Sequence, residues 1–240
     1  MVGAISFLFK CRSICYTIVY MGKITTSRPI LIMLYGFPGA GKTHFARELC
    51  EVINAAHVHG DRIRSEIFET PRRDKQENQI IDHLMGYMTG EFLNAGISVV
   101  YDTNATRVSE RRILREISRK SKAEPVLVWL QIDPDSAMAR LSIRDRRKAD
   151  DKYSVDYTRD LFIEIAKRMQ NPSEGEEPVV ISGKHTFNTQ KSAIMKRLYE
   201  LGVLKMESVS ANVTKPGLVN LIPNINAGRV DMSRRNISIH

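Results

Sequence analysis

One glycine-rich stretch contains the residue types and spacing best suited to chemistry, because it fits the pattern G-x-x-x-x-G-K-[ST]. Glycines leave no Cβ in the way, so successive backbone N–H groups can curl around an anion, and a following helix adds its positive N-terminal end. Lys42 can then reach the β- and γ-phosphates of a nucleotide, and the Thr43 hydroxyl can ligate Mg²⁺. We therefore expect a nucleotide to be bound by Gly36, Phe37, Pro38, Gly39, Ala40, Gly41, Lys42 and Thr43.

The residues on either side of this loop supply the elements that such a site requires. Residues 30–35 form an apolar run typical of a buried parallel strand, and Phe45, Leu49 and Ile53 recur at helical spacing after the loop. The four fixed positions should match by chance in about one chain of this length in a hundred. The flanking strand and helix patterns make a chance match to the motif a still weaker explanation.

A carboxylate follows the second predicted strand, residues 56–59. Ligands of open α/β sheets bind at the carboxyl ends of the strands, and Asp61 there could take a proton from an acceptor hydroxyl as general base. The alternative is that Asp61 only caps the next helix. The two roles are compatible, and we favour the base.

A second carboxylate, Asp102, ends the third predicted strand, residues 97–101. An acid in this place beside a phosphate-binding loop can hold Mg²⁺ through water or orient an arginine. Thr43 and Asp102 are therefore the candidate metal ligands.

Basic residues are concentrated in one segment, where five of the nine residues 140–148 are Lys or Arg. Arg140 and Arg144 are expected to share one face of a helix. A mobile arginine-rich lid that closes over a triphosphate would have this composition. The alternative, an exposed helix end favoured by the helix dipole, explains one or two of the arginines but not all of them.

The other arginines lead to less specific expectations. Arg72 and Arg73 fall in a predicted loop, where they could contact an anionic acceptor or only water. Four more lie along a predicted surface helix, and we expect most of them to be solvated; they are Arg107, Arg111, Arg112 and Arg115.

Strand and helix patterns alternate along the chain, which predicts an α/β domain with a five-stranded parallel sheet. The expected strands are residues 30–35, 56–59, 97–101, 126–132 and 178–181, and the expected helices include residues 43–53, 73–95, 155–169 and 190–201.

The 240 residues, 42% of them hydrophobic, are enough for one domain, which we expect at residues 28–204. Residues 1–27 are interpreted as an N-terminal extension outside the fold, with Met21 as an alternative start. Residues 205–240 show no sustained periodicity and are expected to form a disordered or loosely attached tail.

Composition and charge exclude several classes of protein. Lys10 and Arg12 interrupt the apolar N-terminal residues, so no run is long enough to span a bilayer, and we expect no membrane partner. Cys11, Cys15 and Cys50 suit neither a disulfide framework nor a zinc site, which favours a cytoplasmic protein. The net charge of +9 is largely carried by the two ends of the chain and is weak evidence for a polyanionic partner.

Together these motifs resemble those of P-loop kinases of the polynucleotide 5′-hydroxyl kinase family, AAA-type ATP-binding proteins related to zeta toxins and antibiotic phosphotransferases. The resemblance covers about residues 29–203 and depends on the loop, on residues 61–64, on residues 99–104 and on the run of Arg140, Arg144 and Arg146. It implies a P-loop NTPase three-layer α/β/α sandwich with a five-stranded parallel sheet and an arginine-rich lid. The predicted lid is longer and more basic than the family pattern.

The resemblance also implies the nucleotide contacts. ATP and Mg²⁺ would be bound by Lys42 and Thr43, and a lid arginine would contact the nucleotide phosphates. Arg144 fits that lid position best, and Arg146 is next.

On the acceptor side, the resemblance implies Asp61 as general base, Arg64 on a phosphate of the acceptor, and Asp102 orienting Arg64. We therefore expect a kinase that transfers the γ-phosphate of ATP to a hydroxyl, with a nucleic-acid 5′-hydroxyl as the favoured acceptor. The alternatives are a small-molecule kinase acting on an antibiotic, nucleoside or nucleotide sugar, and an ATP-binding regulatory module with little turnover. A mechanical AAA+ ATPase is disfavoured because no second acid stands beside Asp102.

Overall fold

The computed structural model describes residues 23–204, except 105, 146 and 149–150. The expectations for residues 1–22, for the tail from 205 onward and for Arg146 lie outside the described residues. Among the helices that are described, none has the length and apolar character needed to cross a membrane.

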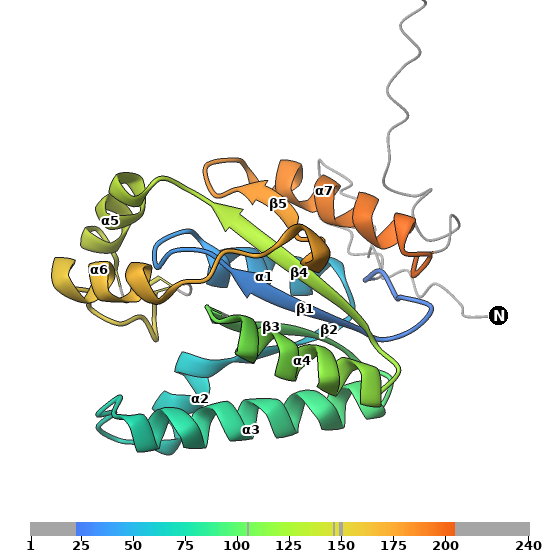
Figure 1. Cartoon of the computed structure of the whole chain (residues 1–240), viewed down its shortest axis with the longest axis horizontal. Coiled ribbons are helices and arrows are strands. Elements are labelled where there is room, and N and C mark those ends of the chain that lie inside the picture. Colours follow the sequence, from blue (N-terminus) through green and yellow to red (C-terminus); the bar gives the residue numbers. More distant parts are fainter. Residues whose placement is uncertain (1–22, 105, 146, 149–150, 205–240) are drawn as a thin grey trace, which may run out of the picture. The chain divides into compact units, whose positions relative to one another are not determined.

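The described chain forms one five-stranded sheet in the order β2-β3-β1-β4-β5, with every neighbouring pair parallel (Figure 1). This confirms the predicted fold class. All residues of the central strand β1 are fully buried, which explains its unbroken apolar run. The strands are β1 (Ile30–Tyr35), β2 (Ala55–His59), β3 (Ser98–Asn104), β4 (Glu124–Gln131) and β5 (Val179–Ser182).

Helices cover both faces of the sheet. Helices α3 and α4 pack together on one face, and α1 and α7 lie against the other, while α5 and α6 sit together at one end of the sheet, on the left in Figure 1. The helices are α1 (Lys42–Val52), α2 (Gly60–Ile67), α3 (Lys75–Asn94), α4 (Val108–Lys120), α5 (Pro134–Ser142), α6 (Arg159–Arg168) and α7 (Phe187–Glu200).

Several helix boundaries differ from the prediction. Helix α7 begins at Phe187, three residues before the predicted start at residue 190. Helix α5 ends at Ser142, so the expectation that Arg140 and Arg144 share a helical face is wrong. Beyond the helix end, the backbone N–H of Asp145 donates to the Asp151 carboxylate, which holds a turn in place of a further helical turn. Helix α6 begins four residues later than predicted because Thr158, whose hydroxyl accepts from the backbone N–H of Leu161, is its N-cap.

Residues 23–27 contact the domain, although the sequence placed them in the N-terminal extension. The backbone N–H of Ile24 donates to Val52 O at 2.8 Å, and that of Ser27 donates to Val203 O at 2.9 Å. These residues therefore belong with the fold, and the predicted boundary at residue 28 falls too late.

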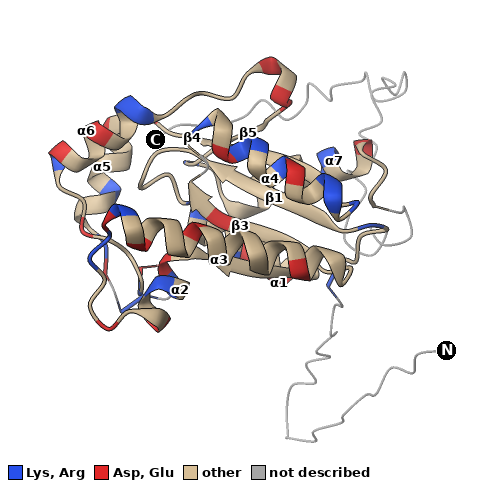
Figure 2. Ribbon diagram, turned by 60° about the horizontal axis from the view of Figure 1, so that its bottom comes forward, with Lys and Arg blue, Asp and Glu red and all other residues tan. Residues whose placement is uncertain are grey.

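Charged side chains of both signs are interspersed along α4 and α6 (Figure 2). One of them is not solvated as the sequence led us to expect. Arg111 is fully buried on α4 and donates from Nε and Nη2 to the Glu176 carboxylate at 2.8 and 2.9 Å. Arg115 donates to the same carboxylate at 2.8 Å.

The Arg111–Glu176 pair ties α4 to the short 3₁₀ turn Glu174–Glu176 that precedes β5. This turn is therefore a point at which the segment before β5 is anchored to α4. The hydrogen bond from Arg111 lowers the pKa of Glu176 to about 2. A carboxylate with a depressed pKa stabilises the fold above its ordinary pKa, and the stabilisation is lost as the pH falls through the depressed value.

We expect Glu176→Gln to destabilise the domain at neutral pH by about 3 kcal/mol, because it leaves Arg111 buried without its counter-charge. Thermal melting followed by circular dichroism should show a midpoint lower by on the order of 6 to 12 °C. The difference from wild type should shrink as the pH falls from the ordinary carboxyl pKa toward about 2. Exposed Glu174→Gln is the matched control, and equal melting of the two variants would contradict a structural role for the pair.

Candidate active site

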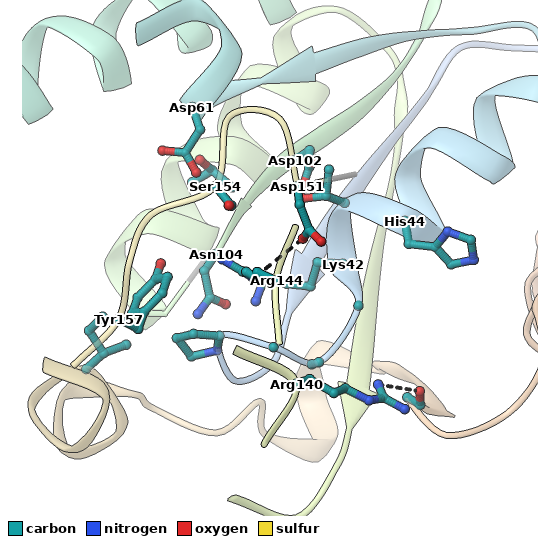
Figure 3. A pocket seen from close by; sticks show the side chains of 18 of the residues that line it. Lys42, His44, Asp61, Asp102, Asn104, Arg140, Arg144, Asp151, Ser154 and Tyr157 are labelled. Carbon is teal, nitrogen blue, oxygen red and sulfur yellow. Dashed lines mark hydrogen bonds and ion pairs between the residues drawn. The ribbon is translucent and has the colours of Figure 1, made fainter. Parts of the chain in front are cut away.

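A cleft of about 740 Å³ opens at the carboxyl ends of the strands. Open parallel sheets bind ligands at this edge, where the strand order changes direction. The glycine-rich loop, the ends of β2 and β3, the segment after α5 and the β5–α7 turn all line it. Figure 3 shows Lys42, Asp61, Asp102 and Arg144 among the side chains around it.

The glycine-rich loop needs its glycines. Gly39 has a φ of +84°, and a Cβ there would lie 2.4 Å from the carbonyl oxygen of Ala137 in α5. Gly41, at +96°, is the N-cap of α1 and leaves the first turn of the helix without a side-chain cap. The loop can therefore turn its backbone N–H groups toward an anion.

Lys42 is folded onto its own loop, and its Nζ donates to the carbonyl oxygens of Gly36 and Phe37 at 2.8 and 2.9 Å. Burial lowers its pKa to about 8, and the nearby Asp102 carboxylate opposes that shift. The Lys42 amine therefore lies next to the glycine-rich loop that is suited to bind an anion.

Asp102 is the buried acid of the site, with a side chain only 3% exposed. Its Oδ1 accepts from the Thr43 hydroxyl at 3.4 Å, and its Oδ2 lies 3.0 Å from His57 Nε2. Burial by itself would raise its pKa, but the hydrogen bond from His57 and the charges of His59 and His57 hold the pKa below its usual value. A hydroxyl and an ionised carboxylate side by side are hard oxygen ligands that fit Mg²⁺.

The expectation that Asp102 orients Arg64 is wrong. Arg64 donates instead to the Glu77 carboxylate and, at 2.8 Å, to Asn78 Oδ1, both in the first turns of α3. Arg64 and Glu77 are buried together, and Arg64 is not among the residues that line the cleft. Sequence reasoning missed Glu77, because an acid three residues after the cap residue Asp74 is typical of an ordinary helix start.

Glu77 also shapes the loop between α2 and α3. Its Oε2 accepts from the backbone N–H groups of Arg72 at 2.7 Å and Arg73 at 3.1 Å. Arg73 has a φ of +58°, which costs energy for any residue with a side chain and persists only where its surroundings hold it. Arg64 and Glu77 thus stabilise the strained backbone conformation of Arg73.

Arg73 in turn reaches Asp61, with 2.7 Å between its Nη1 and the Asp61 Oδ1. Both side chains are about one third exposed. Of the two loop arginines whose role the sequence left open, Arg73 faces the candidate base, and Arg72 is largely exposed beside Asp74. Asp61 lies inside the first turn of α2, whose N-cap is His59, so the alternative of Asp61 as the cap is wrong.

The arginines of the predicted lid have separate partners. Arg140 donates to the carbonyl oxygen of Gly183 at 2.9 Å, and the Arg144 guanidinium lies 3.6 Å from Asp151 and over the ring of Tyr157 (Figure 3). Both line the cleft, whereas Arg147 is 91% exposed. Motion of this segment as a lid stays a prediction.

Asn104 is a further residue of the site. Its Oδ1 accepts from the backbone N–H of Gly36 at 3.2 Å, which joins the end of β3 to the start of the loop. Its Nδ2 is buried and has no hydrogen-bond partner within the described part of the chain. The sequence showed Asn104 only as part of the motif after the third strand.

Comparisons with known proteins address the family and the fold. A protein-family model described as an AAA domain matches residues 31–170. No curated protein matches the chain. Many solved structures do, and the similarity extends over nearly the whole length of each of the three given next.

Kti12 of Chaetomium thermophilum with ADP-AlF3 is 14% identical, with a TM-score of 0.57 over 73% of this chain and 99% of that one. APS kinase CysC of Mycobacterium tuberculosis with AMPPNP and APS is 16% identical, with a TM-score of 0.54 over 72% and 98%. A gluconokinase from Sinorhizobium meliloti 1021 is 17% identical, with a TM-score of 0.53 over 72% and 93%. At these identities the likeness shows the fold alone.

We expect Glu77→Ala to loosen the α2–α3 loop, because two backbone N–H groups and Arg64 lose a charged acceptor. Hydrogen bonds to charged groups contribute about 1.5 to 3 kcal/mol, so amide exchange at Arg72 and Arg73 should quicken by about tenfold or more. Hydrogen–deuterium exchange mass spectrometry of peptides spanning residues 70–76 measures this. Exposed Glu69→Ala should leave the exchange unchanged, and equal protection in both variants would rule out the support.

Proposed function

Because the chain belongs to the AAA domain family and has the fold of P-loop kinases, we propose that it transfers the γ-phosphate of ATP to a hydroxyl group, with Mg²⁺ as cofactor. One observation carries the proposal: a single cleft is lined both by the glycine-rich loop and by the carboxylate of Asp61. The first can bind a triphosphate and the second can accept a proton. The nucleotides bound in two structures of this fold, AMPPNP in APS kinase and ADP-AlF3 in Kti12, support ATP as the donor.

In the proposed reaction the glycine-rich loop and the two arginines that line the cleft act on the nucleotide. Lys42 exchanges its bonds to the loop carbonyls for the β- and γ-phosphates, and the N–H groups of the first turn of α1 hold the same oxygens. Arg144 and Arg140, which both line the cleft, stabilise charge on the transferring group. Arg146 is a further candidate on its sequence position.

Thr43 and Asp102 would hold the Mg²⁺ ion through the hydroxyl and the carboxylate that lie 3.4 Å apart. When bound, the ion neutralises charge on the phosphate oxygens. Asp102 stays ionised for this role because its pKa is held low.

Asp61 acts on the acceptor as the general base. Its carboxylate takes the proton of the acceptor hydroxyl while the hydroxyl oxygen forms a bond to the γ-phosphorus and the bond to the β–γ bridging oxygen breaks, so that ADP leaves. Before this, Asp61 must separate from Arg73. An anionic group on the acceptor, close to the hydroxyl, would draw Arg73 away and leave the base able to act.

A nucleic-acid 5′-hydroxyl is the acceptor we favour, since a backbone phosphate follows it within the same nucleotide. We assign that phosphate to Arg73, which reaches the base, in place of Arg64, which is buried below the cleft. Small-molecule acceptors are the second candidate. They are favoured by the cleft volume, about 740 Å³, which falls in the range of about 300 to 1,000 Å³ typical of small-molecule sites.

Asp61→Asn should lower phosphoryl transfer by about 100-fold to 10,000-fold while ATP still binds, because the variant loses the proton acceptor and keeps the phosphate loop. Transfer of radiolabelled phosphate from ATP to 5′-hydroxyl DNA, 5′-hydroxyl RNA and an extract of small metabolites measures this and identifies the acceptor. Lys42→Ala sets the background, and exposed Asp160→Asn on α6 is the control. An ATP-binding regulatory module would instead show wild-type and Asp61→Asn proteins alike, with no transfer to any acceptor.

Arg73→Ala should raise the KM for the acceptor by about tenfold or more and leave the KM for ATP nearly unchanged, because a charge-assisted hydrogen bond to the acceptor is lost. Steady-state kinetics with the acceptor found by the screen measure both. Exposed Arg72→Ala is the control. If Arg64→Ala produced that change at unaltered melting temperature and Arg73→Ala did not, the acceptor phosphate would belong to Arg64.

A further inference from the structure

Two histidines lie beside Asp102 on the neighbouring strand, and the proposed reaction uses neither. His59 of β2 is in register with Asp102 of β3, and His57 stands two residues earlier in the same strand, so both project from the same face of the sheet. Strand β2 is the edge of the sheet, and His59 lines the cleft. The cluster is therefore open to small solutes from the cleft.

The three side chains converge on one point. His57 Nε2 lies 3.0 Å and His59 Nε2 lies 3.7 Å from the same oxygen, Asp102 Oδ2. One ligand atom from each residue falls within 4.8 Å of both others. Ligands of a tetrahedral zinc ion, with bonds of about 2.0 to 2.1 Å, stand about 3.3 Å apart. Small rotations of the imidazoles would give that spacing.

A hydrogen bond to Asp102 explains the position of His57 but not that of His59. At 3.7 Å, His59 Nε2 is too far from Asp102 Oδ2 for a hydrogen bond, yet it lies near the same oxygen that His57 contacts. Its ring is parallel to that of His57, with 1° between the planes and 5.4 Å between the centroids. Two imidazoles thus face one carboxylate oxygen.

The chemistry of the cluster favours a borderline metal ion. Each of the three side chains offers one possible ligand atom, two imidazole nitrogens and a carboxylate oxygen, and Asp102 is buried. Imidazole nitrogens prefer zinc, cobalt and nickel to magnesium, which takes oxygen ligands.

We propose that His57, His59 and Asp102 form a binding site for a divalent transition-metal ion of the zinc type. The site lies on the Oδ2 side of the Asp102 carboxylate, whereas Thr43 lies on the Oδ1 side. An ion bound at Oδ2 interacts with the same carboxylate charge that attracts Mg²⁺ at Oδ1. Zinc bound here therefore opposes magnesium at the catalytic position, a consequence that depends on the proposed function.

The site is tested by titrating Zn²⁺ into the nucleotide-free and magnesium-free full-length chain in a calorimeter, with Co²⁺ absorption spectra as a second readout. Wild type and His83→Ala, an exposed histidine on α3, should bind one equivalent alike. His59→Ala should bind at least tenfold more weakly and lose the cobalt spectrum. His59 makes no hydrogen bond to Asp102, so this variant should fold, which circular dichroism checks.

His57→Gln provides the second variant, because it can still donate a hydrogen bond to Asp102 while it removes the imidazole. Weakened binding in both variants supports the site. Binding equal to wild type in either correctly folded variant, or the absence of a bound equivalent in wild type, would overturn it. These readouts need no turnover, so the site is judged even if the kinase proposal fails. In an active enzyme, zinc should inhibit His59→Ala at concentrations at least tenfold higher than it inhibits wild type.

Discussion

The buried carboxylate of Asp102 is the constraint on which the site depends. A charge removed from water costs several kcal/mol unless its oxygens are paired, and here Thr43 pairs one oxygen and His57 the other. Thr43 belongs to the glycine-rich loop and His57 to the edge strand β2. Pairing one acid therefore holds the first turn of α1 in register with the ends of β2 and β3.

A second pair of buried charges supports the loop between α2 and α3. Arg64 and Glu77 pair below the surface, and the remaining oxygen of Glu77 holds the backbone of the loop that carries Arg73. The contact with Asp61 and the support of Glu77 offset the energy cost of the left-handed backbone conformation of Arg73. The position of Arg73, and with it the contact to the candidate base, thus depends on Glu77, which does not itself line the cleft.

Ion pairs serve different purposes in different parts of the domain. Arg111 and Glu176 lie away from the cleft, and their pairing joins α4 to the approach of β5. The pairs around Asp102 and Asp61 instead leave atoms that face the cleft. Paired charges of the first kind stabilise the fold, and those of the second kind keep charged groups available for a ligand.

The sequence by itself determined the features that are local in the chain. The strand Ile30–Tyr35, the loop after it and the five-stranded parallel sheet could be predicted because apolar periodicity and glycine spacing depend on near neighbours. Only the tertiary structure decided that Glu77 rather than Asp102 holds Arg64, that Arg111 is buried, and that the histidines of β2 meet Asp102. These contacts join residues far apart in the sequence, so their partners are set by which elements pack together, and no local pattern carries that information.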